Sequence, residues 1–454
     1  MSKDTYLLPN ETARHLYFDM AEGLPIIDYH NHLDMRRLSD NTPFDDMTAL
    51  WIAPDPYKHR LMRICGVPEA YITGGAAPYE TFWKWCEIFP RLIGTPVYDW
   101  SVCELRTVFG ITETPCRGSA ASLWAQTNEM LASDEYTPQG ILHRFNIEYA
   151  APCASVTDDL SPFAASDTFA PSLRGDDLTH PTAAFIRTVE EKTSAVLSTL
   201  DDYIAALAVL IDRFISVGCR FADHALDDGF RCCPNDGKNE YRYTKVRRGE
   251  PLDTSDADAL TSEILRRMMG EYAKRNMTVQ LHIGAARHTS TRLRKIAGAA
   301  GGFAGIGSDI DVQSIIRLLD GVEMGAYGLP RTVLFTLNPS YNAAFAALSG
   351  SFSKDGVRSV VSCGPAWWWC DHKSGMESAF EDMASFSVLS EFIGMTTDSR
   401  SLLSFVRHDY FRRVFCGWLG EKVEKGIYPH DEAALDKLIR RVCYENAHDI
   451  LING

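Results

Sequence analysis

The chain has 454 residues, of which 45% are hydrophobic and 23% are charged, and its formal net charge is −15. This composition is that of a globular protein and excludes an intrinsically disordered chain. The acidic balance excludes a nucleic-acid-binding protein or an anionic membrane surface as partner, and no apolar run approaches the roughly 18 residues of a membrane span.

The first predicted strand runs from Ile26 to His32 and ends in two histidines one residue apart, His30 and His32. In a strand, residues i and i+2 point to the same face, so both imidazoles project together. Two such imidazoles begin a divalent metal site. Because His-x-His also occurs by chance, the metal site depends on further ligands at other strand ends. The pair favours a (β/α) barrel, whose chemistry lies at the carboxyl ends of its strands.

More than a hundred residues, 33–146, separate this strand from the next candidate. The segment contains amphipathic runs typical of helices, including Thr81 to Phe89 and Ala121 to Leu131. A structureless loop of this length is implausible. We therefore predict three parts: residues 1–32 with strand 1, a mostly helical insertion over residues 33–146, and the rest of the barrel over residues 147–454.

Seven further apolar runs, rich in β-branched residues, end in polar or small residues. Stretches of helical pattern separate most of them, as at Ala205 to Val217, Thr261 to Arg275, Gln313 to Leu319 and Met376 to Ser390. Strands that alternate with helices indicate a parallel sheet, and eight units favour a closed (β/α)8 TIM barrel. The runs are Ile147 to Val156, Thr168 to Arg174, Cys219 to His224, Thr278 to Ile283, Thr332 to Asn338, Val357 to Gly364 and Phe392 to Asp398.

Asp398 ends the eighth predicted strand, which neighbours strand 1 in a closed barrel. Two imidazoles and one carboxylate form a catalytic metal set that leaves positions open for substrate. Alone, Asp398 is better explained as the N-cap of the helix that follows. Beside His30 and His32, it is better explained as the third metal ligand.

Histidines also follow the fourth and fifth predicted strands. For His282 we expect a second-sphere position or a substrate contact, against the alternative of a core hydrogen-bond network. His224 is a weaker candidate, with Asp223 as its expected partner.

Two arginines at strand ends, Arg174 and Arg400, suit bidentate capture of a substrate carboxylate, although most arginines form structural ion pairs. Tyr57, in the insertion, is followed by Arg60 and Arg63 at helical spacing. These arginines either reach the site from above or form a solvated face.

Three consecutive tryptophans follow the seventh strand, and Trp367 and Trp368 are candidates to contact the apolar face of a sugar, although large aromatics are more often core.

The glycine-rich run from Gly298 to Gly307 does not pass from a strand directly into a helix, so a flexible loop is favoured over a phosphate cradle. The twelve cysteines, with no Cys-x-x-Cys, indicate reduced, mostly buried thiols. The N-terminal residues lack a signal-peptide pattern, and we expect a cytoplasmic protein.

The chain resembles the uronate isomerases, the glucuronate isomerase branch of the amidohydrolase superfamily, nearly from end to end. The resemblance rests on motifs found in order: PIIDYHNHL from Pro25, PSLR from Pro171, ADHALD from Ala222, LHIGAAR from Leu281 and GMTTDSRSLLSFVRHDYFRR from Gly394. Asn31 stands where the family has cysteine, Leu173 replaces a tryptophan, and Gly175 replaces a proline. The last two departures affect the loop of Arg174 and bear on substrate preference.

The resemblance implies a distorted (β/α)8 barrel with one divalent metal at His30, His32 and Asp398. Zinc is the usual ion, with Mn²⁺, Co²⁺ and Fe²⁺ as alternatives. It also implies interconversion of D-glucuronate with D-fructuronate, and of D-galacturonate with D-tagaturonate, in a homo-oligomer active in glucuronate catabolism.

The expected reaction moves a proton from C2 to C1 of the open-chain substrate through a cis-enediol. Asp398 and Tyr57 are the two candidates for the base, and the sequence does not choose between them. Arg174 and Arg400 would hold the substrate carboxylate or its hydroxyls, with Arg400 also counted as catalytic. A metal-dependent hydrolase of the same superfamily and a non-catalytic uronate sensor are the competing interpretations, and product analysis separates them from an isomerase.

Overall fold

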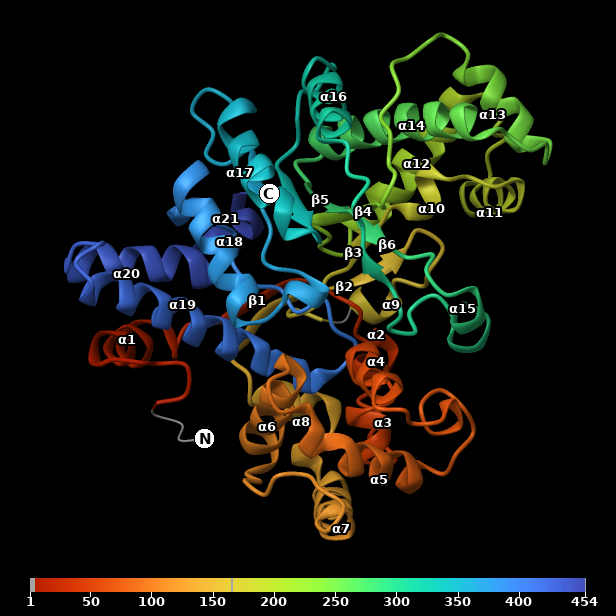
Figure 1. Ribbon diagram of the computed structural model, residues 1–454. Coiled ribbons are helices and arrows are strands. Elements are labelled where there is room, and N and C mark those ends of the chain that lie inside the picture. Colours follow the sequence, from red (N-terminus) through yellow and green to blue (C-terminus); the bar gives the residue numbers. More distant parts are fainter. Residues whose placement is uncertain (1–4, 165, 454) are drawn as a thin grey trace.

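A curled parallel sheet lies at the centre of the computed structural model, which describes residues 5–164 and 166–453 (Figure 1). The expectation drawn from the first four residues therefore lies outside the described residues. Seven strands lie side by side in the order β1-β2-β3-β4-β5-β8-β9, and every neighbouring pair is parallel. The strands are β1 (Ile26–Asn31), β2 (Ile147–Ser155), β3 (Ser172–Arg174), β4 (Phe221–Leu226), β5 (Thr278–Ile283), β8 (Thr332–Thr336) and β9 (Val361–Cys363).

Helices connect successive parallel strands and surround the sheet, as the alternating pattern predicted (Figure 1). The four helical stretches expected between strands correspond to α12, α14, α16 and α18, although their ends differ by several residues. None of the described helices is both long and apolar enough to cross a bilayer. The helices outside residues 33–146 are α1 (Glu11–His15), α9 (Ser161–Ala164), α10 (Asp176–Thr179), α11 (Ala183–Thr193), α12 (Leu200–Ile215), α13 (Asn239–Arg247), α14 (Thr254–Lys274), α15 (Thr291–Ala297), α16 (Val312–Glu323), α17 (Asn342–Ser351), α18 (Lys373–Phe386), α19 (Val406–Glu424), α20 (Glu432–Arg440) and α21 (Asn446–Asn453).

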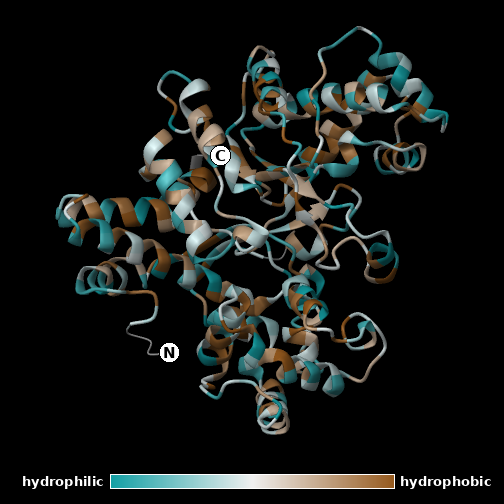
Figure 2. Ribbon diagram, in the orientation of Figure 1, coloured by the Kyte–Doolittle hydropathy of each residue, from teal (hydrophilic) through white to brown (hydrophobic). Residues whose placement is uncertain are grey.

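The segment between β1 and β2 is helical and gathers on one side of the sheet (Figure 1). Hydrophobic and hydrophilic residues are interspersed along its helices (Figure 2), and the buried rings of Trp51, Phe82 and Trp85 pack together among them. A buried lysine, Lys58, joins Asp55 and Glu104 at 2.6 and 3.3 Å inside this group. The domain limits at residues 32 and 146 stay a prediction. The helices are α2 (Met35–Ser39), α3 (Met47–Trp51), α4 (Pro56–Ile64), α5 (Pro78–Ile88), α6 (Pro96–Phe109), α7 (Ala120–Leu131) and α8 (Pro138–His143).

The predicted eighth strand, Phe392 to Asp398, lies beside β1 but is not a regular strand. Two backbone hydrogen bonds of the expected kind are present, from Asp398 N to His30 O (3.0 Å) and from His32 N to Ser399 O (2.8 Å). Side chains replace the rest of the ladder, since His30 N donates to Thr396 Oγ1 at 2.8 Å. The buried carboxylate of Asp28 accepts hydrogen bonds from this same segment. The segment therefore occupies the expected position without regular strand geometry.

The glycine-rich run belongs to a flap, residues 285–306, in which β6 (Ala285–Ala286) and β7 (Gly305–Ile306) pair antiparallel around α15. Arg63 donates to Gly301 O, and Arg60 donates to Ala304 O at 3.2 Å. Gly302 has φ +77°, and a Cβ there would lie 2.1 Å from the backbone oxygen of Pro56. The two arginines that follow Tyr57 therefore fasten the flap to the insertion.

Candidate active site

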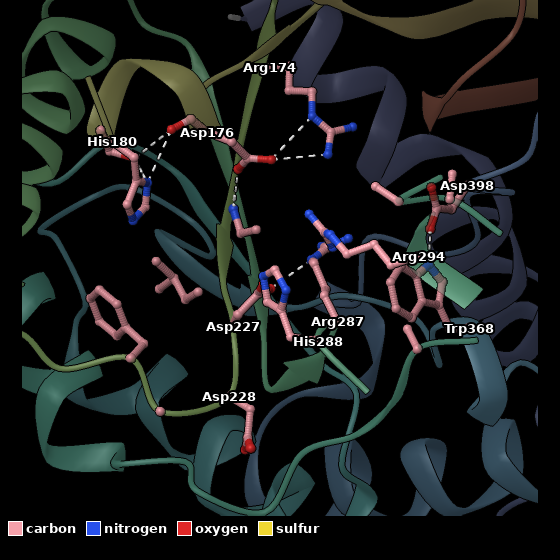
Figure 3. A pocket seen from close by; sticks show the side chains of 18 of the residues that line it. Arg174, Asp176, His180, Asp227, Asp228, Arg287, His288, Arg294, Trp368 and Asp398 are labelled. Carbon is pink, nitrogen blue, oxygen red and sulfur yellow. Dashed lines mark hydrogen bonds and ion pairs between the residues drawn. The ribbon is translucent and has the colours of Figure 1, made fainter. Parts of the chain in front are cut away.

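A cavity of about 480 Å³ opens at the carboxyl ends of the strands (Figure 3). His32, Arg174 and Leu226 reach it from the ends of β1, β3 and β4. Tyr57 reaches it from the first turn of α4, where Asp55 caps the helix by accepting from the Tyr57 and Lys58 backbone N–H groups. The flap forms the opposite wall. The site thus combines barrel, insertion and flap, as expected for an active site at this face.

His30, His32 and Asp398 meet at the edge of this cavity. Asp398 Oδ1 lies 3.4 Å from His30 Nε2 and 3.1 Å from His32 Nε2. Burial lowers the pKa of His32 to about 4, which keeps its imidazole neutral and able to bind a cation. Burial opposes ionisation of Asp398, but the hydrogen bonds from both histidines outweigh it and hold the pKa of Asp398 well below its usual range. The structure thus brings the three predicted ligands together.

The second oxygen of Asp398 accepts two indole hydrogen bonds. Trp367 Nε1 donates to Oδ2 at 2.7 Å and Trp368 Nε1 donates to it at 2.6 Å. Tandem indoles at the end of the β9 loop therefore engage this oxygen, which would exchange an indole hydrogen bond to accept a proton. Trp368 lines the main cavity, whereas Trp367 is buried against His282 with ring centroids 4.8 Å apart. Both tryptophans thus fix the carboxylate.

Further donor groups lie behind His30. Cys153 Sγ is 3.5 Å from His30 Nδ1 and also 3.5 Å from Asp223 Oδ1. The His282 ring lies 4.6 Å from the His30 ring, and His282 Nε2 is buried without a hydrogen-bond partner among the described residues. Two groups have donor atoms all within 4.8 Å of one another: His30, His32 and Cys153, and His30, Asp223 and His282. Burial raises the pKa of the Cys153 thiol to about 11.

His282 is thus not on the wall of the main cavity, and its substrate contact stays a prediction. The expected pairing of Asp223 with His224 was wrong, because adjacent residues of a strand face opposite sides. Asp223 faces the donor groups inside the barrel, whereas His224 Nε2 contacts Tyr272 Oη at 3.1 Å on the outer side.

The two predicted arginines differ in how they are held. Arg174 forms an ion pair with Asp176 at 3.0 Å, and Asp176 in turn accepts from the Ala225 backbone at 2.8 Å. Arg400 also lines the cavity, and no described residue forms a hydrogen bond or ion pair with its guanidinium. Arg400 is therefore the better placed of the two to receive an anionic ligand group.

Tyr57 presents a phenol to the cavity. Its Oη is buried and has no hydrogen-bond partner among the described residues, while the Arg407 guanidinium lies over its ring, 5.4 Å from the centroid. Burial raises the pKa of Tyr57 well above its usual value. The phenol is therefore neutral near pH 7 and acts as a hydrogen-bond donor.

Several residues with clear roles were not predicted. Asp28 joins β1 to the segment before Asp398, and Arg407 donates to Thr397 O at 2.7 Å and pairs with Asp371. Arg287 pairs with Asp227 at 2.7 Å and lies over the Trp368 ring on the cavity wall (Figure 3). A charged residue inside an apolar strand is a signal for Asp28. Arg287 and Arg407 lie within motifs shared with the uronate isomerases, but nothing in the residues around them indicates their partners.

Comparison with known proteins gives one consistent result. The model of the family described as glucuronate isomerase matches residues 1–451. Uronate isomerases of Mannheimia succiniciproducens and Salmonella arizonae are 35% and 36% identical to this chain, and each match covers 98% of both sequences. The crystal structure of the uronate isomerase of Thermotoga maritima superposes with a TM-score of 0.92 at 28% identity, over 99% of both chains. That of glucuronate isomerase from Caulobacter crescentus has a TM-score of 0.91 at 23% identity, over 100% of this chain and 97% of the other, which shows the shared fold. The predicted distorted barrel is confirmed.

Proposed function

This chain belongs to the glucuronate isomerase family and is an aldose–ketose isomerase, and on that premise we propose that its cavity interconverts D-glucuronate with D-fructuronate and D-galacturonate with D-tagaturonate. The observation that carries the proposal is the meeting of His30, His32 and Asp398 beside a cavity lined by Arg400, whose guanidinium has no ion-pair partner in the described part of the chain. A volume of about 480 Å³ accommodates a hexuronate.

The donor set fits one divalent cation held by His30, His32 and Asp398. The imidazole of His32 is neutral and the carboxylate of Asp398 is ionised. Burial lowers the pKa of His30, but Cys153 and Asp398 outweigh burial and raise it well above its usual value, so His30 would give up a proton on binding a cation. Two imidazoles and one carboxylate are ligands that zinc, manganese, cobalt and iron all accept, and we propose zinc first. The orphaned Nε2 of buried His282 adds a further donor nearby. When bound, such a cation supplies Lewis acidity that stabilises negative charge developing on substrate oxygens.

Arg400 would hold the substrate carboxylate. Its guanidinium has the fork geometry that binds carboxylates in a bidentate manner, and no protein carboxylate competes for it among the described residues. Arg174 is engaged by Asp176, so its contribution is to orient substrate hydroxyls through its remaining N–H groups. An extended uronate would then have its carboxylate at Arg400 and its carbonyl end towards His30 and His32.

We propose that Asp398 takes the proton from C2 and returns it to C1 through the cis-enediol. It is the ionised member of the two candidate bases, and one group serves both transfers because the proton remains on one face of the substrate. Tyr57 Oη, a neutral phenol without a partner, donates a hydrogen bond to a substrate oxygen and follows the charge as it moves. Closure by the flap and insertion excludes water from the enediol.

The test is turnover of purified, metal-supplemented protein on D-glucuronate and on D-galacturonate, with products identified by NMR in D₂O. The expected result is the corresponding ketose, with deuterium entering at the reacting carbon where the proton exchanges with solvent. Asp398→Asn should abolish turnover, whereas Asp258→Asn makes the same charge change on the cavity wall and should retain it. Ketose formation by Asp398→Asn at the wild-type rate would refute the role of Asp398. A product heavier by one water would identify a hydrolase.

We also propose, from the family resemblance, that the chain forms a homo-oligomer, acts in glucuronate catabolism in the cytoplasm and belongs to the amidohydrolase superfamily. Size-exclusion chromatography with light scattering tests the first point directly.

A further inference from the structure

Cys153 is a donor that the three-ligand site does not use. It lies on β2, directly beside β1, where Pro152 pairs with Asn31 and Cys153 itself pairs with Ser172 of β3. Its sulfur points inward to His30, at 3.5 Å from Nδ1 and 3.9 Å from Nε2. The donor atoms of Cys153, His30 and His32 all lie within 4.8 Å of one another.

Three of the distances among His30, His32, Asp398 and Cys153 are close to those of a tetrahedral cation site, although Asp398 belongs to neither of the two groups whose donor atoms all lie within 4.8 Å of one another. With zinc–nitrogen, zinc–oxygen and zinc–sulfur bonds of standard length, ligand atoms of a tetrahedron lie about 3.4 Å apart for nitrogen and oxygen, and about 3.6 Å apart for nitrogen and sulfur. Asp398 Oδ1 is 3.4 Å from His30 Nε2 and 3.1 Å from His32 Nε2. The sulfur of Cys153 is 3.9 Å from that same His30 nitrogen. These three separations are within about 0.3 Å of their ideal values.

We propose that Cys153 is a fourth protein ligand of the cation, which His30, His32 and Asp398 hold with it. The inference deepens the proposed function and rests on its metal site. Cys153 would hold the cation as a thiolate, and Asp223 Oδ1, which accepts the hydrogen bond from Sγ at 3.5 Å, would take up the thiol proton. A cation held in this way would still supply Lewis acidity to substrate oxygens.

A thiolate among the ligands determines which cation the site prefers. Soft sulfur ligands favour zinc and cobalt, whereas manganese and magnesium prefer oxygen ligands. The chain should therefore bind zinc over manganese more strongly than a site of two histidines and one aspartate would. Cys153 would act as a selectivity-determining ligand, and the alternative group of His30, Asp223 and His282 contains no sulfur.

The experiment uses the full-length protein loaded with Co²⁺, whose bond to a thiolate gives an intense charge-transfer absorption in the near ultraviolet. The wild type should show this band at one Co²⁺ per chain, Cys153→Ser should bind Co²⁺ without it, and Cys363→Ser, a matched change on β9, should keep it. Competition between Zn²⁺ and Mn²⁺ should show the zinc preference of Cys153→Ser reduced by roughly 10-fold or more, the scale of lost metal-site interactions.

Each outcome decides the matter. A wild type that binds one Co²⁺ without the band overturns the role of Cys153 and leaves the three-ligand site and the proposed function standing. A wild type that binds no Co²⁺, Zn²⁺ or Mn²⁺ overturns the metal site itself and this inference with it. Because the wild-type spectrum is sufficient for either conclusion, a Cys153→Ser variant that fails to fold does not prevent the test.

Discussion

The two indole hydrogen bonds to Asp398 Oδ2 lead to a sharp prediction. Trp367→Phe and Trp368→Phe each keep an aromatic ring in place and remove only the N–H donor, which lies 2.7 or 2.6 Å from the carboxylate oxygen. The oxygen facing the histidines is not touched. The substitutions therefore test whether the indoles hold the carboxylate in its working position or merely fill space.

The expected size follows from the charge on the acceptor. A hydrogen bond to an ionised group contributes about 1.5–3 kcal/mol, which corresponds to roughly a 10- to 100-fold change in an equilibrium or rate that depends on it. Groups that orient metal ligands show a similar range when they are removed. For Trp368→Phe we expect a metal dissociation constant raised about 10-fold and kcat/KM lowered by roughly 10- to 100-fold. The double variant should lose more, though less than the product of the two effects, because both donors share one oxygen.

The assay combines steady-state isomerisation of D-glucuronate at saturating metal with a chelator competition that gives metal affinity. Trp369→Phe is the matched control, because the Trp369 indole donates to Ala304 O at 3.0 Å and not to Asp398. It should keep metal affinity and kcat while loosening the flap. If the double variant, Trp367→Phe with Trp368→Phe, kept both metal affinity and kcat/KM within twofold of the wild type, the argument that the indoles position Asp398 would be refuted.

Three further predictions concern the frame of the site. Gly302 has φ +77°, and a Cβ there would lie 2.1 Å from a backbone oxygen, so Gly302→Ala should weaken docking of the flap by at least about 1 kcal/mol. The variant should therefore show a higher KM and faster proteolytic cleavage of the flap. Gly305→Ala is the control, because its Cβ would meet its first atom at 3.6 Å, and it should change neither KM nor cleavage. Lys58→Met leaves two buried carboxylates without a cation and should lower the free energy of unfolding in urea by about 3–5 kcal/mol, while Lys84→Met, in a half-exposed pair, should change it by less than about 1 kcal/mol. Hydrogen bonds from Arg63 lower the pKa of Glu69 from 4.5 to about 2. The stability that these hydrogen bonds give the folded protein is therefore fully present above pH 4.5 and is lost as the pH falls through 2. Glu69→Gln should therefore show a smaller drop in Tm across this window than the wild type, and an equal drop would contradict the assignment.

The sequence was sufficient to predict the barrel because apolar runs typical of strands alternate with helical patterns along the whole chain. Apolar runs in the sequence predicted β1, β2, β4 and β5 closely, and closure of the barrel predicted that Asp398 lies beside His30, as it does. The eighth strand was a less accurate prediction. Hydrophobicity alone cannot show that a threonine hydroxyl and the carboxylate of Asp28 replace the backbone ladder there.

The site was only partly predictable because its details depend on side-chain direction. Arg174 and Arg400 follow strands in the same way, yet only the structure shows that Asp176 already engages the first. Cys153 was one of twelve cysteines with nothing to distinguish it in sequence, since its importance arises from β2 lying beside β1. The tandem tryptophans were candidates to contact a sugar, which stays a prediction, and only the structure shows that their indoles donate to Asp398.

Backbone conformation explains how those indoles reach the carboxylate. Asp398 and Trp368 are both in the left-handed region, with φ of +46° and +48°. Each such residue costs of order 1–3 kcal/mol when it is not glycine, and it persists only where surrounding contacts over-determine it. Such contacts surround both residues here. Backbone and side-chain hydrogen bonds fix the segment around Asp398 to β1. The hydrogen bond from the Trp368 indole to the Asp398 carboxylate joins the two strained residues to each other. Strain at both ends of a single 2.6 Å hydrogen bond indicates that the fold spends stability on placing this one carboxylate, and a residue that served only as a helix cap would need no such arrangement.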